Sequence, residues 1–229
     1  INGGVNHFGS PFNFPEEFIT VYRLHPLLPD LLEYREWDKE PNVIRNKVPV
    51  IETFRGKATE AMRQKGLANW ALSLGRQRLG LLTPQNHPQF LQNLKLPRLQ
   101  SSTQQIDVAA LDLIRDRERG IPRYNEFRRQ YGLKQLTSFD DFIDQTETKP
   151  EVRREQEQLV QTLREVYGQH QCNESKKITT AQKNDDKDKT PINDCLGHQN
   201  GTVIDNIEDV DTVVGWLAET RSSDHRHEK

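Results

Sequence analysis

A tyrosine and a histidine lie three residues apart in the stretch VYRLHPLLPD, residues 21–30. Histidine is a ligand for metal ions and a proton-transfer group. Pro26 disfavours the α conformation at His25, so we expect a helix to end or bend there and to leave the imidazole free of a following turn. Three residues rise about 4.5 Å along a helix and return to nearly the same face, which would bring Tyr22 close to His25. In isolation the pair also fits a core tyrosine and a capping histidine.

A second group of candidate ligands lies in a polar stretch nearer the carboxyl end. His170 and Cys172 form H-x-C, and Cys195 and His198 form C-x-x-H. Histidine nitrogen and cysteine sulfur are common zinc ligands, but this spacing is not that of a recognised zinc finger. The alternative is that both cysteines are free thiols in a reducing compartment, and this is the interpretation that we favour.

Helical periodicity indicates the elements that must position these residues. Gly120 suits a helix end and Pro122 a helix start, so two helices should meet at a tight corner. No sheet is indicated, and the state of Val48–Phe54 is left open. The expected helices are residues 15–35 with a bend at Pro26, Thr59–Leu82, a short piece at Phe90–Leu94, Asp107–Arg119, Pro122–Tyr131, Pro150–Tyr167 and Ile207–Glu219.

The composition is polar for a folded protein. Hydrophobic residues make up 33% of the chain and charged residues 29%, and the mean hydropathy is -0.86. Such a composition predicts that part of the chain is disordered. The stretch 169–206 has few large apolar residues, so we predict a disordered polar insert there. The predicted organisation is a helical domain over residues 1–168, the insert over 169–206, a returning helix over 207–220 and a disordered tail over 221–229.

Charge and hydropathy restrict the partners. The formal net charge of -2 gives no electrostatic reason to expect a nucleic acid. The sequence has no apolar run of the length that a transmembrane helix needs, and its first residues lack the pattern of a signal peptide. These features favour a cytoplasmic or peripheral membrane protein. Ile1 is not an initiator methionine and Met62 is the only methionine, which suggests a processed piece or a fragment of a longer chain.

Two long stretches carry a resemblance to a known family. EEFITVYRLHPLLPD and DVAALDLIRDRERGIPRYNEFRRQYGL resemble the animal-type heme peroxidase superfamily, and most closely its fatty-acid oxygenase branch, which includes α-dioxygenases and cyclooxygenases. RDRERGIPRYNEFRR looks more like α-dioxygenase than cyclooxygenase. The similarity runs over residues 6–168 and resumes at Ile207–Glu219. It implies a mainly α-helical fold of the heme peroxidase and cyclooxygenase type.

The resemblance also implies roles for individual residues. By matching position, His25 is the proximal ligand of a heme b iron, and Tyr22 becomes the radical that takes a hydrogen atom from a fatty acid before dioxygen adds. Asn125 corresponds to the asparagine that accepts a hydrogen bond from the proximal histidine, which would fix the tautomer of that histidine. The charges of RDRERG, residues 115–120, are expected to pair partly with one another. The resemblance implies fatty acid, dioxygen and peroxide as partners. It also implies a role in fatty-acid and oxylipin metabolism and in the response to oxidative stress.

The sequence departs from the family in length. Family members carry a distal histidine well upstream of the proximal one, and no segment before Tyr22 supplies it. We therefore expect this chain to be the proximal-side part of the catalytic domain. By itself it should not oxygenate fatty acids at a useful rate, and we expect another segment or chain to complete it. Whether the chain is itself an enzyme is left open. The alternatives are a catalytically inactive, truncated helical remnant that serves as an interaction module and, within the class, a cyclooxygenase or a general peroxidase.

Overall fold

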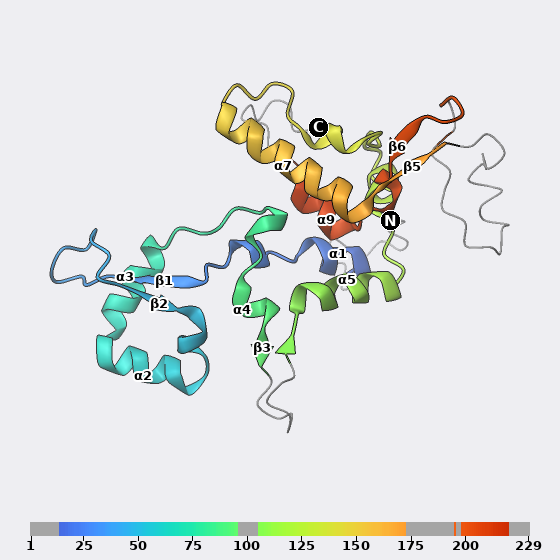
Figure 1. Cartoon of the computed structure of the whole chain (residues 1–229). Coiled ribbons are helices and arrows are strands. Elements are labelled where there is room, and N and C mark those ends of the chain that lie inside the picture. The colour runs from blue at the N-terminus through green and yellow to red at the C-terminus, as the bar shows by residue number, and fades with distance from the viewer. Residues whose placement is uncertain (1–13, 96–104, 173–194, 196–197, 220–229) are drawn as a thin grey trace, which may run out of the picture. The chain divides into compact units, whose positions relative to one another are not determined.

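Helices dominate the part of the chain that the computed structural model describes, which is residues 14–95, 105–172, 195 and 198–219 (Figure 1). The predicted mainly α fold is therefore confirmed. The chain divides into two units. The split unit combines residues 1–21 with residues 120–229, and the continuous unit runs from Tyr22 to Arg119. Of the described helices, none has both the length and the apolar character that crossing a bilayer requires.

The split unit contains α7, which covers Pro150–Tyr167 as predicted. Pro150 stands at the first helical position, where its missing N–H costs no hydrogen bond. The other elements of this unit are α1 (Glu16–Val21), α6 (Tyr124–Gln130), the 3-10 turn η4 (Phe139–Phe142), β5 (Gln169–Gln171), β6 (Val203–Asp205), the 3-10 turn η6 (Ile207–Asp209) and α9 (Thr212–Ala218).

A single apolar cluster holds the split unit together. Leu159, Val160 and Leu163 form the buried face of α7, and α9 lies beside this helix (Figure 1). Burying one large apolar side chain stabilises a fold by about 1.5–3 kcal/mol. Because the side chains come from segments far apart in the sequence, their burial holds the described segments of this unit together. The cluster is completed by Tyr124, Phe139, Phe142, Ile207, Val210 and Ala218.

A buried carboxylate joins η4, α7 and β6. Asp205 is 5% exposed and accepts hydrogen bonds from the backbone N–H of Phe139 at 2.7 Å, from Ser138 Oγ at 2.9 Å and from Arg164 Nε at 3.1 Å. Burial opposes the ionisation of Asp205, but these hydrogen bonds outweigh it and lower the pKa of the carboxyl group. Asp205 therefore stays charged and orients the three elements around it.

The continuous unit is built from shorter pieces. Its longest helices are α2 (Gly56–Lys65), α3 (Leu67–Arg76) and α5 (Val108–Glu118). The other elements are the 3-10 turns η1 (His25–Leu27), η2 (Val50–Thr53) and η3 (Pro84–Asn86), the strands β1 (Leu31–Tyr34), β2 (Asn46–Pro49), β3 (Leu94–Lys95) and β4 (Gln105–Ile106), and α4 (Gln89–Gln92).

Polar side chains join the hairpin β1–β2 to α3 in this unit. The strands are antiparallel, with Leu31 opposite Pro49. Beyond β1, the backbone N–H of Arg35 donates to Ser73 Oγ of α3 at 2.7 Å. Ser73 is 3% exposed, so this hydrogen bond is shielded from water. The hairpin and the helix are thus held by hydrogen bonds as much as by apolar contact.

Several predictions about the elements are confirmed and others are wrong. The helices expected over Asp107–Arg119 and Pro122–Tyr131 are present as α5 and α6. The single helix expected over Thr59–Leu82 is two helices, because Gly66 between them has φ +80° and interrupts the helical backbone. The helix expected from Ile207 begins only at Thr212, after η6.

The prediction that no sheet forms is also wrong. The described residues contain three two-stranded antiparallel ladders: β1–β2, β3–β4 and β5–β6. Residues 31–34, expected to continue a helix, are β1. The longest of these strands has four residues, which is too short for a clear alternation of apolar and polar residues. The last ladder lies at the two ends of the predicted insert 169–206, and most of that insert and the tail 221–229 fall outside the described residues.

Candidate functional site

His25 begins the 3-10 turn η1 in the continuous unit. The backbone N–H of Leu28 donates to the carbonyl of His25 at 2.9 Å, and the N–H of Leu27 donates to Leu24 at 3.0 Å. Pro26 follows the histidine and its side chain is fully buried. The chain therefore turns sharply after His25, as the proline predicts. The buried Pro26 ring anchors this corner and fixes the backbone φ angle there.

Gly80 packs directly against this corner from a distant part of the sequence. Its N–H donates to the carbonyl of Leu27 at 3.0 Å. A Cβ atom at this position would lie 2.3 Å from the carbonyl oxygen of Pro26, which no real side chain tolerates. Only glycine allows the two backbones to approach this closely, so Gly80 helps to determine where His25 is held.

A charged pair lies beside the imidazole. Asp112, on α5, has Oδ2 3.8 Å from Nδ1 of His25 and Oδ1 3.2 Å from Nη2 of Arg23. The first distance is too long for a hydrogen bond but close enough for electrostatic attraction. Asp112 thus faces one ring nitrogen of His25, which leaves Nε2 as the nitrogen available to a metal. The sequence predictions did not include Asp112, although it lies inside the second family-like stretch.

A second histidine borders His25. The rings of His25 and His87 have centroids 5.7 Å apart. Burial lowers the pKa of His25, with smaller contributions from His87 and Arg23 in the same direction and from Asp112 in the opposite one. His25 is therefore neutral at neutral pH, which is the form that binds a metal. Among the described residues, His87 Nδ1 and Arg23 Nε are buried without a hydrogen-bond partner, so each has a hydrogen-bonding capacity that these residues leave unused.

Tyr22 lies just outside α1, which ends at Val21. The helix thus stops before Tyr22, and the expectation that one helix face presents both residues is wrong, because residues 22–24 between α1 and η1 are not helical. The Tyr22 side chain is 68% exposed. It is therefore a surface tyrosine of the continuous unit and not a core residue. Its three-residue spacing from His25 along the chain is unchanged.

Asn125 belongs to the split unit and is 1% exposed. Its Oδ1 accepts from the backbone N–H of Leu136 at 2.8 Å, and its Nδ2 donates to the Leu136 carbonyl at 2.8 Å and to Glu208 at 2.5 Å. Both amide protons are used within the split unit. One lone pair of Oδ1 is left, so the predicted hydrogen bond from His25 stays a prediction.

One pair in the charged run at the end of α5 forms within the run, as expected from the resemblance, while Arg117, Glu118 and Arg119 are exposed. Arg115 Nη2 lies 2.9 Å from Asp116 Oδ1. Asp116 is 6% exposed, so this carboxylate needs its partner. The pair stabilises the end of the helix that carries Asp112 rather than facing water as an ordinary surface charge.

The second candidate group comes together on the hairpin β5–β6. Donor atoms of His170, Cys172 and Cys195 all lie within 4.8 Å of one another, whereas His198 is not part of this group. Cys172 and Cys195 form a disulfide, so the prediction of free thiols is wrong. The Cα atoms of the two cysteines lie 5.4 Å apart, which suits a disulfide and which the sequence spacing could not indicate. Zinc needs thiolates, and the disulfide form does not offer them.

Comparison with known proteins gives a consistent result. Residues 9–174 match the family model described as animal haem peroxidase. The chain is 36% identical over 169 residues to alpha-dioxygenase 2 of Arabidopsis thaliana and 35% identical over 170 residues to alpha-dioxygenase 1 of Capsicum annuum, in each case over 71% of this chain. The crystal structure of Oryza sativa fatty acid alpha-dioxygenase is similar with a TM-score of 0.65, at 28% identity over 95% of this chain.

The chain spans about a quarter of the length of these relatives, 25% of each of the two curated proteins and 29% of the rice structure. Another rice structure combines a tyrosine-to-phenylalanine substitution with palmitic acid, and it matches with a TM-score of 0.56 at 26% identity, over 93% of this chain.

Proposed function

Because the chain belongs to the animal haem peroxidase family, we propose that it forms the heme-binding part of a fatty-acid α-dioxygenase. In this proposal His25 would hold the heme iron, and Tyr22 would take hydrogen from the substrate. The observation that carries it is the corner at His25, where a neutral imidazole is held between buried Pro26 and Asp112.

The residues present fit a heme. The neutral His25 ring has one nitrogen beside a carboxylate and the other available for iron, which is the arrangement of many metal-binding histidines. Asp112 favours a proton on Nδ1 and thereby keeps the lone pair on Nε2. Arg23, already paired with Asp112, adds positive charge next to the ligand. Heme, when bound, supplies the oxidising power that side chains lack.

Tyr22 has the chemistry for the next step. A bound heme would supply the oxidising equivalent for Tyr22, whose phenol would give up one electron and its proton and would then take a hydrogen atom from a fatty-acid carbon. The phenol would thereby be restored, and the carbon radical would add dioxygen to form a peroxyl radical, which would take a hydrogen atom back from the phenol. Because the side chain is largely exposed in the continuous unit, a substrate chain can reach its oxygen. Positioning of that substrate is the work of the complete enzyme.

Titration with hemin tests the ligand. We expect a red-shifted, saturable Soret band for the unaltered chain and its loss in His25→Ala, with the far-UV circular dichroism unchanged. His198→Ala is the matched control, because it removes a histidine from the other unit. Equal spectra for His25→Ala and the control would exclude His25 as ligand.

The role of Tyr22 is tested separately. Peroxide added to the heme-loaded chain should produce a tyrosyl radical in electron paramagnetic resonance, and Tyr22→Phe should remove most of that signal. Tyr131→Phe is the control, since Tyr131 is also exposed, at 54% against 68%. A signal that survives Tyr22→Phe and disappears in Tyr131→Phe would place the radical elsewhere.

A further inference from the structure

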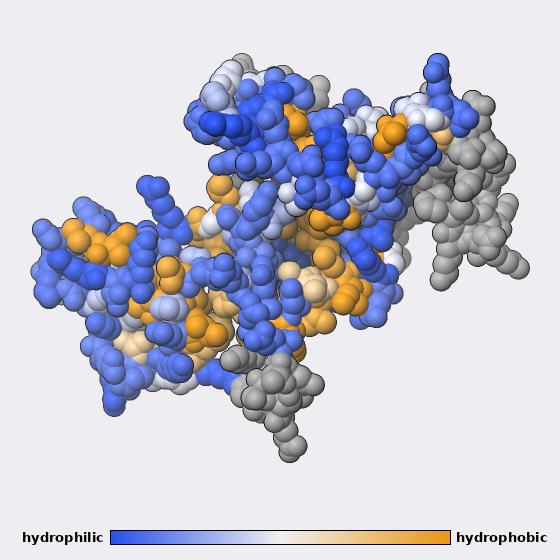
Figure 2. All heavy atoms as spheres, in the orientation of Figure 1, coloured by the Kyte–Doolittle hydropathy of each residue, from blue (hydrophilic) through white to orange (hydrophobic). Residues whose placement is uncertain are grey.

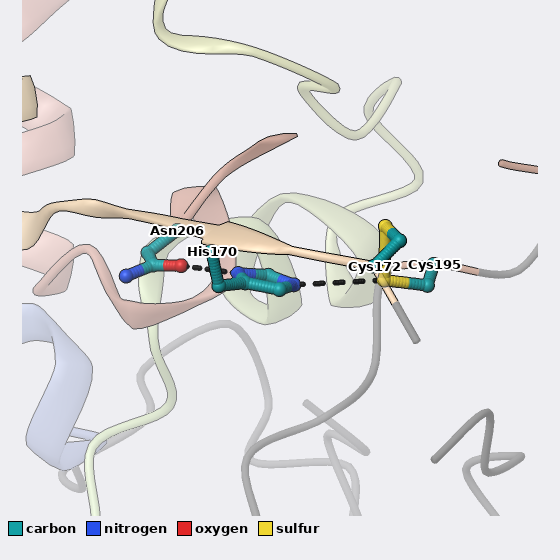
Figure 3. The surroundings of a disulfide bond; sticks show 4 residues. All are labelled: His170, Cys172, Cys195 and Asn206. Carbon is teal, nitrogen blue, oxygen red and sulfur yellow. Dashed lines mark hydrogen bonds between the residues drawn. A yellow bond between two sulfur atoms is a disulfide. The ribbon is translucent and has the colours of Figure 1, made fainter. Parts of the chain in front are cut away.

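A buried disulfide and a half-buried histidine lie close together at the hairpin β5–β6 (Figure 3). Cys172 is 2% exposed and Cys195 is 1% exposed. The His170 ring points toward the sulfur atoms, with Nε2 3.7 Å from Sγ of Cys195. None of these residues takes part in the proposed heme chemistry, and all three lie in the split unit.

Asn206 determines the tautomer of His170. Its Nδ2 donates to the carbonyl of Tyr167 at 2.8 Å, which turns its Oδ1 toward Nδ1 of His170. An amide oxygen only accepts, so Nδ1 of His170 must carry the proton. In the neutral ring Nε2 therefore has its lone pair directed at the sulfur atoms. A hydrogen bond of this kind behind a ligand is what metal-binding histidines usually have.

The backbone would keep His170 and Cys172 together without the disulfide. Cys172 donates its N–H to the carbonyl of Thr202 at 2.7 Å, and Gly201 donates to the carbonyl of Cys172 at 2.8 Å. His170 is held in register opposite Ile204 by the β5–β6 ladder. Reduction of the S–S bond thus leaves His170 and Cys172 where they are, on a hydrogen-bonded hairpin.

We propose that the reduced hairpin is a zinc site, with His170 Nε2 and the thiolates of Cys172 and Cys195 as its three protein ligands. One nitrogen and two sulfurs in a compact group suit Zn²⁺ better than the hard cations Mg²⁺ and Ca²⁺, which prefer oxygen. Water occupies the fourth, tetrahedral position. The disulfide and the zinc-bound form are alternative states of one cluster.

The two states interconvert by balanced chemistry. A dithiol reductant gives two electrons to the S–S bond and is itself oxidised to a disulfide, and the two cysteine thiols then lose their protons as Zn²⁺ binds. In reverse, hydrogen peroxide takes two electrons from the thiolates and two protons from solvent, and becomes two molecules of water. The S–S bond forms and Zn²⁺ is released. Peroxide would thus act on this site as an oxidant.

Zinc titration of the full chain, before and after reduction with a phosphine that is then removed, tests the proposal. Competition with a chromophoric chelator should show one Zn²⁺ bound per reduced chain and none per oxidised chain. Asn206→Ala should weaken binding by about 10–100-fold, because it frees the His170 ring. His170→Ala should weaken zinc binding at least as much. Because the oxidised form of this variant keeps the disulfide, it serves as the control for whether the hairpin still folds.

His198→Ala is the matched control and should bind zinc as the unaltered chain does, because His198 stands outside the cluster. Loss of binding in this variant would overturn the three-ligand site. So would undiminished binding in His170→Ala, which would mean that the thiols alone hold the metal. Absence of zinc from the reduced, unaltered chain would overturn the proposal altogether. Replacing Zn²⁺ by Co²⁺ gives an independent readout, because thiolate ligands to Co²⁺ produce a charge-transfer absorption. This absorption should be altered in the His170→Ala variant.

Discussion

The two units of this chain bury their apolar side chains to very different degrees. The split unit has one cluster in which Phe139 and Val210 are completely inaccessible to solvent. The continuous unit has many of its large apolar side chains at the surface, and Leu67, Leu74 and Leu81 are each at least 68% exposed. Orange apolar atoms lie among blue hydrophilic ones on the surface that Figure 2 shows.

The continuous unit depends more on hydrogen bonds, relative to apolar burial, for its stability. Asp30 accepts from the backbone N–H groups of Gln89 and Phe90, each at 3.3 Å, and the N–H of Glu33 donates to Gln77 at 2.8 Å. Such bonds each stabilise by about 0.5–1.5 kcal/mol, less than a buried aromatic ring. The unit that carries Tyr22 and His25 is thus expected to be the less stable of the two.

Phe139→Ala should produce the largest effect. The ring is fully buried in the cluster of the split unit, so its loss should reduce the free energy of unfolding of that unit by about 3–5 kcal/mol. Fluorotryptophan NMR resolves the units, because Trp216 lies in α9 while Trp37 and Trp70 belong to the continuous unit. Denaturant titration should shift the Trp216 transition far more than the others. Leu81→Ala, at an exposed position, is the control and should stay within about 0.5 kcal/mol.

Asp205→Asn should have an intermediate effect that depends on pH. At neutral pH, the loss of the charged acceptor should cost the split unit about 1.5–3 kcal/mol. The folded state lowers the pKa of Asp205, so its contribution is complete above the ordinary value of 3.8 and is lost as the pH falls through the lower, folded value. Acid unfolding followed at Trp216 should therefore be less steep in the variant. Asp38→Asn, an exposed change in the other unit, should leave that curve unaltered.

Leu74→Gln should have the smallest effect on stability. Leu74 is 75% exposed, so the free energy of unfolding should change by no more than about 0.5 kcal/mol. Self-association at high concentration, measured by sedimentation, should decrease because an exposed apolar group is removed. A loss of stability comparable to that of Phe139→Ala would show that the continuous unit buries this residue, and the contrast between the units would disappear.

The sequence predicted the helices best where strong signals agreed. Asp107 caps α5 through the N–H of Ala110 at 3.1 Å, and Pro150 begins α7, so local residues determine both starts. The break at Gly66 was missed because glycine within a periodic apolar pattern does not by itself end a helix. The strands were missed because their pairing depends on residues distant in the sequence.

The candidate site was predictable only in its motif residues. Tyr22 and His25 stand out through their spacing and the following proline. Asp112 and Gly80 act on the same corner, but nothing in their own neighbourhood in the sequence connects them to it, since the contacts form only in the folded continuous unit. The pairing of Cys172 with Cys195 is of the same kind.

The close approach of Gly80 to the turn after His25 has a consequence for the order in which the site is assembled. Protein synthesis begins at the amino end, so His25 leaves the ribosome long before the glycine that completes its corner. The hydrogen bond from Gly80 to Leu27 closes a long loop, and contacts that close long loops form late. The chain must therefore be made at least as far as residue 80 before His25 is held in place, and a nascent chain shorter than that has the histidine without the contact that fixes its turn.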